Sequence, residues 1–255
     1  MVKTGLEQNS SYMLSWAELT GLVLLYYLIT WQIAPHAMQL HWLLLLGMVA
    51  AAGWIGYYLF WVSPVLHGDS PGARGLDSST CKTSFVYYFV LLLIGLSVIV
   101  VMIYLKYGQR PPDIDWGVFW LKYGFYLTSA FLQDLIFFSF FQLRIKEIVS
   151  THFTNKSEQL WITVGVVAVA FGLFHIPNWP LTLFSIGFGF LVSLSFYLRP
   201  NIWAVVLIHA LLGTVLHRIY QLHMKIGLFY GQTSPDASFF RKIIPFTEAL
   251  ISDKW

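Results

Sequence analysis

The sequence predicts an all-α fold, a polytopic bundle of helices that cross a membrane. Hydrophobic residues make up 57% of the 255 residues and charged residues only 11%, whereas soluble domains carry about 25% charged residues. Apolar runs of about 20 residues, the length that a helix needs to cross the hydrocarbon core, recur along the chain. Many tryptophans fall near the ends of these runs, as is typical of aromatic belts at membrane interfaces. We therefore expect an integral membrane protein with several spans.

About seven spans are predicted from the apolar runs. The fifth and sixth are short, and Ile176-Pro177-Asn178-Trp179-Pro180 interrupts the chain between them, because proline cannot continue a helix regularly. This pair could instead form one bent hairpin that does not cross the membrane fully. The predicted spans are Trp16–Ile33, Trp42–Leu66, Phe85–Leu105, Trp116–Phe141, Leu160–His175, Leu181–Leu198 and Ile202–Tyr220.

The spans divide into two groups, followed by a tail. We expect residues 1–115 to form an accessory bundle of three spans, residues 116–221 a compact core of four spans, and residues 222–255 an amphipathic tail at the membrane surface or against a partner. The net charge is only +3, without a basic stripe, which argues against nucleic-acid binding and suits contact with membrane lipids. The single cysteine, Cys81, excludes an intrachain disulfide and a cysteine-based metal site.

Three ionisable residues in or beside the spans of the core are candidates for chemistry. Asp134 lies deep in the fourth span, His175 closes the fifth, and His209 lies near the middle of the seventh. A charged aspartate at mid-helix costs about 2.5–3.5 kcal/mol on insertion scales, so we expect these side chains to face the interior of the bundle. Together they could bind a divalent metal such as zinc, or hold and deprotonate a water molecule. They could equally form a hydrogen-bond network that only maintains the fold.

The order and spacing of these residues resemble the CPBP family, which contains the CAAX prenyl proteases and bacteriocin-processing membrane proteins. That family carries a glutamate pair followed by Phe-Arg-Gly, then Phe-x-x-x-His, then His-x-x-x-Asn or Asp. Phe171-Gly172-Leu173-Phe174-His175 is similar to the second motif, with the customary Ile-Pro-Asn after it, and His209-Ala210-Leu211-Leu212-Gly213 matches the third only at its histidine. The resemblance extends from about Phe131 to Leu216. It implies a CPBP-protease-like core and an intramembrane endopeptidase as the related activity.

The departures from the family pattern fall on the residues that would carry out the chemistry. Where the family has its first glutamate, the general base, this chain has Gln133, and an amide has no usable acid–base pKa. The second glutamate falls on Asp134, the arginine on Phe138, the glycine on Ser139 and the last Asn or Asp on Gly213. Asp134 lies about 100° further round an α-helix than position 133, so it could replace the base only if this span were rotated.

Three functions stay open at this point. The combination of Gln133, Phe138 and Gly213 favours a catalytically impaired member of the family, a pseudoprotease that holds a lipid, a lipidated peptide or a partner membrane protein in the former active-site cavity. The first alternative is an active endopeptidase, in which Asp134 is the base while the two histidines orient water and stabilise the oxyanion. The second alternative is a structural subunit of a larger membrane complex.

Overall fold

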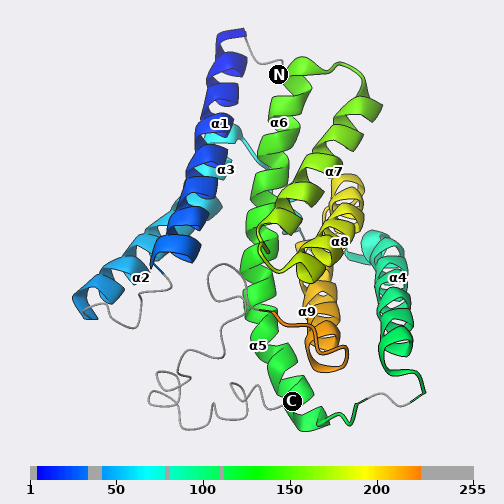
Figure 1. Ribbon diagram of the computed structural model, residues 1–255. Coiled ribbons are helices and arrows are strands. Elements are labelled where there is room, and N and C mark those ends of the chain that lie inside the picture. The colour runs from blue at the N-terminus through cyan, green and yellow to red at the C-terminus, as the bar shows by residue number, and fades with distance from the viewer. Residues whose placement is uncertain (1–4, 34–41, 78–80, 110–111, 225–255) are drawn as a thin grey trace.

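The computed structural model describes residues 5–33, 42–77, 81–109 and 112–224, and within these ranges every regular element is a helix (Figure 1). This confirms the all-α prediction. Of the tail predicted over residues 222–255, all but the first three residues lie outside the described residues. The α-helices are α1 (Gly5–Tyr27), α2 (Trp42–Tyr57), α3 (Ser63–His67), α4 (Cys81–Tyr107), α5 (Trp116–Asp134), α6 (Gln142–His152), α7 (Lys156–Leu173), α8 (Trp179–Leu198) and α9 (Ile202–Arg218).

Fewer helices than predicted have the length and hydropathy of a membrane span. Helix α9 is apolar but has only 17 residues, and the first turn of α7 carries Lys156 and Glu158. The protein is membrane-embedded, but the predicted number of seven spans is not confirmed. Within the described residues, four helical segments meet both requirements, and they are Ser11–Trp31, Ser84–Tyr107, Trp116–His152 and Trp179–Leu198.

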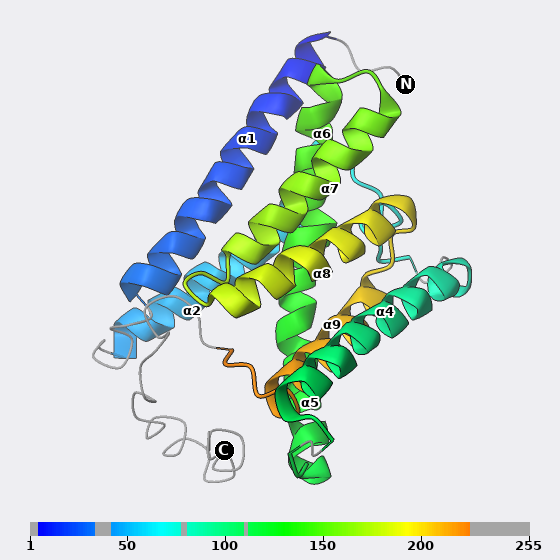
Figure 2. The ribbon, with the colours of Figure 1, turned by 45° about the vertical axis from the view of Figure 1, so that its right-hand side comes forward.

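One continuous helical rod, Trp116–His152, runs through the centre of the molecule and carries the candidate site near its middle (Figure 2). Asp115 caps its start, because its side chain accepts a hydrogen bond from the backbone amide of Val118 over 3.0 Å. After Asp134 the rod widens into a π-helix, Leu135–Phe141, before α6 resumes the α-helical pattern. Since π-helical hydrogen bonds skip one residue more than α-helical ones, the side chains that follow Asp134 face directions that an unbroken α-helix would not give them.

Helices α7 and α8 form a hairpin and pack along each other (Figure 2). The predicted helix break is present, because α7 ends at Leu173 and α8 begins at Trp179. Asn178 caps α8 by accepting a hydrogen bond from the backbone amide of Leu181 over 3.3 Å, and Pro180 occupies the first turn, where its missing N–H has no helical partner to lose. This hairpin brings the residues after α7, including His175, beside the central rod.

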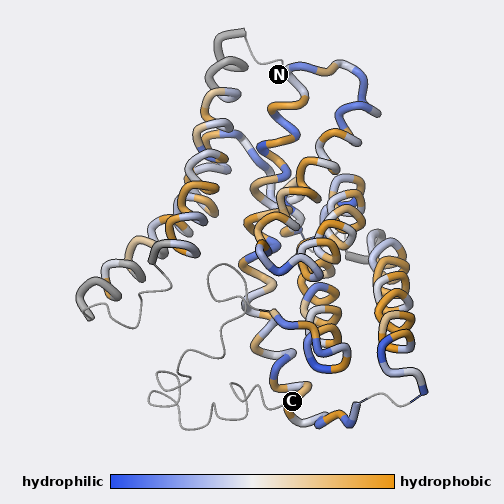
Figure 3. The backbone as a smooth tube through the Cα atoms, viewed as in Figure 1, coloured by the Kyte–Doolittle hydropathy of each residue, from blue (hydrophilic) through white to orange (hydrophobic). Residues whose placement is uncertain are grey.

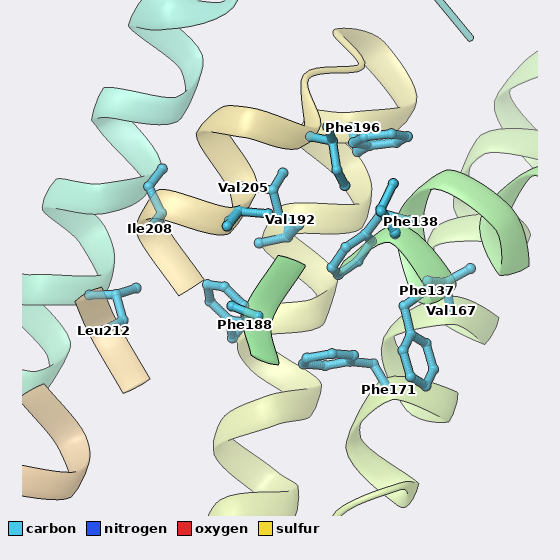
Figure 4. Packing of buried hydrophobic residues seen from close by; sticks show 14 of the residues in the cluster. Phe137, Phe138, Val167, Phe171, Phe188, Val192, Phe196, Val205, Ile208 and Leu212 are labelled. Carbon is cyan, nitrogen blue, oxygen red and sulfur yellow. The ribbon is translucent and has the colours of Figure 1, made fainter. Parts of the chain in front are cut away.

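An aromatic cluster packs the rod against the hairpin (Figure 4). Phe138 of the π-helix is fully buried, with its ring 5.6 Å from that of Phe171 and 6.2 Å from that of Phe196. Phe137 lies perpendicular to Phe171 at 5.1 Å. Edge-to-face and offset rings at these separations stabilise a core beyond their buried area. The cluster therefore fixes the helices that carry the candidate site.

The remaining helices cover this centre from two sides. Helix α9 packs against α5 and α4, whereas α1 packs against α6, so that α1 and α4 lie on opposite sides in both views (Figures 1 and 2). Hydrophobic residues extend along most of the helices, and the connection between α6 and α7 is hydrophilic (Figure 3). Long apolar helices with polar connections are the pattern expected of a protein embedded in lipid.

Candidate functional site

Asp134 and His209 meet inside the bundle, which is where the sequence analysis expects both side chains to face. Asp134 ends α5 and is completely buried, and its Oδ1 lies 2.8 Å from Nδ1 of His209 on α9. A carboxylate oxygen can only accept, so His209 Nδ1 donates the hydrogen, and in the neutral ring Nε2 is left as an acceptor. Asp134 thus fixes the tautomer and the orientation of His209, while its own Oδ2 has no hydrogen-bond partner.

His175 is held in the same tautomer by a different partner. Its Nδ1 donates to the backbone carbonyl of Phe171 over 2.8 Å, one turn back at the end of α7. The ring of Phe171 contacts both histidines, with its centroid 5.3 Å from that of His175 and 5.7 Å from that of His209. The structure therefore brings both histidines to one region, but among the described contacts it connects only His209 to the carboxylate.

A cavity of about 430 Å³ lies between α1, the rod and the end of α7. Pockets of about 300–1,000 Å³ commonly take small molecules. The cavity wall includes Gln133 and His175 but not Asp134. Gln133 is held there by a hydrogen bond from its Nε2 to Ser129 Oγ, over 2.9 Å. The rotation that would place Asp134 at the position of the family's base is therefore absent: the glutamine faces the cavity and the aspartate faces His209.

A second hollow, of only about 20 Å³, lies beside both histidines. A volume of this size holds about one water molecule. It shares His175, Phe171 and Tyr126 with the larger cavity and adds His209 and Gly213. The two spaces together bring Gln133, His175, His209 and Gly213, which fall on positions of the family motifs, to one region.

Two of the substituted family positions are filled by aromatic rings. Phe138, at the arginine position, lies in the aromatic cluster and has no exposed surface. Gly213, at the last Asn or Asp position, lies against Tyr126, and a Cβ atom added at Gly213 would overlap that ring. Tyr126 also stands edge-on to His209, with the ring centroids 5.8 Å apart. Sequence reasoning missed Tyr126, although the glycine at position 213 was a signal that a neighbouring side chain takes up the space.

The described residues do not assemble a metal centre of the kind suggested by the sequence. Among them, no group of three or more His, Cys, Asp or Glu side chains is placed to hold a metal ion. Asp134 instead contacts the ring nitrogen of His209 directly. The zinc site suggested from Asp134, His175 and His209 therefore gains no support from this geometry.

A second buried polar site, which sequence reasoning missed, connects α1, α3 and α6. We call it the ionic cluster, and it comprises Glu18, His67, Asp69, Arg144 and Glu147. Arg144 is 1% exposed; its Nε lies 3.1 Å from Glu18, its NH1 lies 3.5 Å from Glu147, and its NH2 pairs with Asp69. The two nitrogens of the His67 ring lie 3.2 Å from Glu18 and 2.7 Å from Glu147. The cluster therefore ties the first helix to the C-terminal part of the rod.

The position of His67 between two carboxylates favours its charged form. Burial by itself lowers the pKa of His67, but the hydrogen bonds to Glu147 and Glu18 outweigh burial, and the pKa is raised overall. Both ring nitrogens of the imidazolium can then donate at once. The protonated ring adds a second positive charge to the ionic cluster.

The fold and the site together define a helical membrane protein in which a buried histidine–carboxylate pair adjoins an apolar cavity. A family model described as Type II CAAX prenyl endopeptidase Rce1-like matches residues 115–215. The matched segment includes the rod and both histidines, and the match confirms the resemblance to the CPBP proteases. No curated protein and no solved structure matches the chain.

Proposed function

We propose that this protein is a catalytically impaired relative of the CAAX prenyl endopeptidases that binds the apolar chain of a lipid or lipidated peptide in the 430 Å³ cavity. The main support for the proposal is that the side chains of residues 133 and 134 face different neighbours. Gln133 lines the cavity where a general base would be needed, and Asp134 is directed to His209. The cavity is present, and the position that holds the general base in the family is occupied by an amide.

The expected loss of catalysis is large. A general base contributes about 10²–10⁴-fold to a reaction rate, and the Gln133 amide cannot accept a proton from water at neutral pH. Its amide nitrogen is also engaged with Ser129. Among the described residues that line the cavity, no Asp or Glu is present to replace the base.

The wall supplied by α1 supports the binding of an apolar chain. Leu22 and Leu25 of this helix line the cavity, as does Ile29 of the π-helix Leu28–Ile33 that continues it. Tyr26 joins α1 to the end of α7, because its hydroxyl donates to the carbonyl of Phe174 and its ring lies 4.0 Å from the Phe174 ring. Burying apolar surface on such a wall contributes roughly 25 cal/mol per Å². The accessory helix thus completes a cavity that the core alone would leave open on this side.

Photochemical labelling tests the binding proposal. The purified chain in lipid nanodiscs is exposed to a diazirine-bearing hydrocarbon chain, and the labelled peptides are identified by mass spectrometry. Leu25→Trp, which fills the cavity, is expected to abolish labelling of the cavity wall. Leu24→Trp on the exposed face of the same helix is the matched control and is expected to leave labelling unchanged. Equal labelling in both variants, or none in the wild type, would refute binding in this cavity.

An active endopeptidase is the second candidate, and the Asp134–His209 hydrogen bond is the observation that favours it. A carboxylate that orients a histidine is the arrangement by which hydrolases prepare a base. In this arrangement Nε2 of His209 would take the proton and Asp134 would position the ring. Cleavage of a lipidated peptide that depends on His209 would distinguish this candidate from the binding protein.

A further inference from the structure

The polar groups of the cavity wall offer both hydrogen-bond acceptors and donors. The Gln133 amide nitrogen donates one of its two hydrogens to Ser129, so that side chain keeps its carbonyl Oε1 as an acceptor and its second amide hydrogen as a donor. The Nδ1 hydrogen of His175 is used by the Phe171 carbonyl, so Nε2 of the neutral ring is a second acceptor. Tyr126 lines the same cavity, and its hydroxyl can both donate and accept.

The same wall carries no fixed charge. Among the described residues that line the cavity, none is Lys, Arg, Asp or Glu. The arginine position of the family is occupied by Phe138, which is buried in the aromatic cluster. A charged group moved into an apolar site without a partner pays a large desolvation cost. An anionic head group would also face the lone pairs of Gln133 and His175, and a cationic one would find no carboxylate on the lining.

We infer that the ligand of this cavity is a single-chain lipid with an uncharged hydroxyl head group, an inference that rests on the proposed function. A hydroxyl supplies the one hydrogen that Gln133 Oε1 or His175 Nε2 can accept, and its oxygen can accept the hydrogen of Tyr126. A carboxylate or sulfate has no hydrogen to give, and an alkane leaves all these groups without a partner. The volume of about 430 Å³ lies in the lower part of the range of small-molecule pockets, which suits one chain rather than two.

Competition among four ligands with the same chain tests this inference. Hexadecanol, hexadecane, hexadecyl sulfate and hexadecyltrimethylammonium are each titrated against the diazirine probe in nanodiscs. Hexadecanol is expected to displace the probe at roughly three- to tenfold lower concentration than hexadecane, which is the worth of about one hydrogen bond. The two charged competitors are expected to be at least about tenfold weaker than hexadecanol. Equal or stronger competition by hexadecyl sulfate or by hexadecyltrimethylammonium would overturn the inference.

A variant of the wall distinguishes head-group recognition from binding of the chain. Gln133→Leu is expected to remove most of the three- to tenfold advantage of hexadecanol over hexadecane, while hexadecane binding is retained. Thr128→Val, a change of similar shape at an exposed residue of the same helix, is the control and should alter neither ligand. An unchanged preference in Gln133→Leu would overturn the inference. If all four competitors are equivalent, the inference fails while the proposed function stands; if the probe never labels the cavity, the proposed function itself fails.

Discussion

The two buried polar sites of this protein lie along the same helical rod and differ in charge. The ionic cluster joins Arg144 and Glu147 of α6 to Glu18 of α1 and to His67 and Asp69 around the end of α3. The cavity around Gln133 has no Lys, Arg, Asp or Glu among its described lining residues. Both sites contact α1, so the same helix contributes to a charged cluster and to an uncharged cavity wall.

This difference shows where buried charge is retained and where it is absent. In the ionic cluster each charged group lies beside opposite charges, and removing one partner of such a pair leaves an uncompensated charge, which is costly. Of the three family positions that carry charge in this region, two hold Gln133 and Phe138, and the third, Asp134, contacts His209 and does not line the cavity. Charged side chains thus hold helices together in the ionic cluster and are absent from the described lining of the cavity.

Removing the cation of the ionic cluster is expected to have the largest effect. Arg144→Met removes the cation that pairs with Glu18, Asp69 and Glu147, and should lower the free energy of unfolding by about 3–5 kcal/mol. Thermal unfolding in detergent measures the change. Arg199→Met is the control, because Arg199 is exposed and only its contact with the Tyr87 ring, at 5.8 Å, is lost; it should cost no more than about 1 kcal/mol. Equal losses in the two variants would contradict a structural role for the ionic cluster.

The close packing of the Tyr126 ring against Gly213 can be tested by adding a methyl group at position 213. Gly213→Ala places a methyl group into the Tyr126 ring and should destabilise the protein by about 1–3 kcal/mol. Tyr126→Leu in the same chain opens the space, so the double variant should be more stable than the sum of the two single changes predicts. Strict additivity in this double-mutant cycle would show that the two positions do not compete for one space.

Two substitutions of Asp134 test whether its hydrogen bond with His209 stabilises the fold. Asp134→Leu removes the acceptor of the His209 Nδ1 hydrogen and should cost about 1–3 kcal/mol of stability. Asp134→Asn should cost clearly less, because its amide oxygen can still accept that hydrogen. Thermal unfolding of the two variants side by side measures the difference. If both are as stable as the wild type, the hydrogen bond to His209 does not maintain the fold.

The smallest expected effect is a pH dependence that arises from His67. Its pKa is raised in the folded state, so its stabilising contribution is fully present below the unfolded value of about 6.5 and is lost as the pH rises through the folded pKa. The difference in unfolding temperature between wild type and His67→Gln should therefore be largest in mild acid and shrink towards alkaline pH. A difference that grows with pH would contradict the proposed charge of His67.

Sequence reasoning reached the helices and the candidate residues more readily than their contacts. Composition was sufficient for a membrane-embedded all-α fold, and the cost of a charged group in lipid led us to expect Asp134 and His209 in the interior of the bundle, although it did not identify their hydrogen bond. The π-helix after Asp134 was not foreseeable, because six of its seven residues are apolar and the segment fits an ordinary helix equally well. The prediction of seven spans used apolar runs alone. Such runs do not show where a helix begins with polar residues, which shortens the part that can cross the membrane.

The ionic cluster could not be predicted for a different reason. Its residues are far apart in the chain, and Glu18, His67 and Arg144 each look like an ordinary polar residue near the end of an apolar run. Only the packing of α1 against α6 brings them together. Likewise, the pairing of Tyr126 with Gly213 depends on how α5 lies against α9, which no local pattern encodes.

The most direct test of the central claim is a cleavage assay on the chain that also binds the apolar probe. A farnesylated CAAX peptide is incubated with the wild type and with His209→Ala in the same nanodiscs, and the products are measured by mass spectrometry. We predict that the wild type releases no more product than His209→Ala, while the probe still labels the cavity. Product that the wild type forms and His209→Ala does not would contradict catalytic impairment and establish the protein as an active endopeptidase.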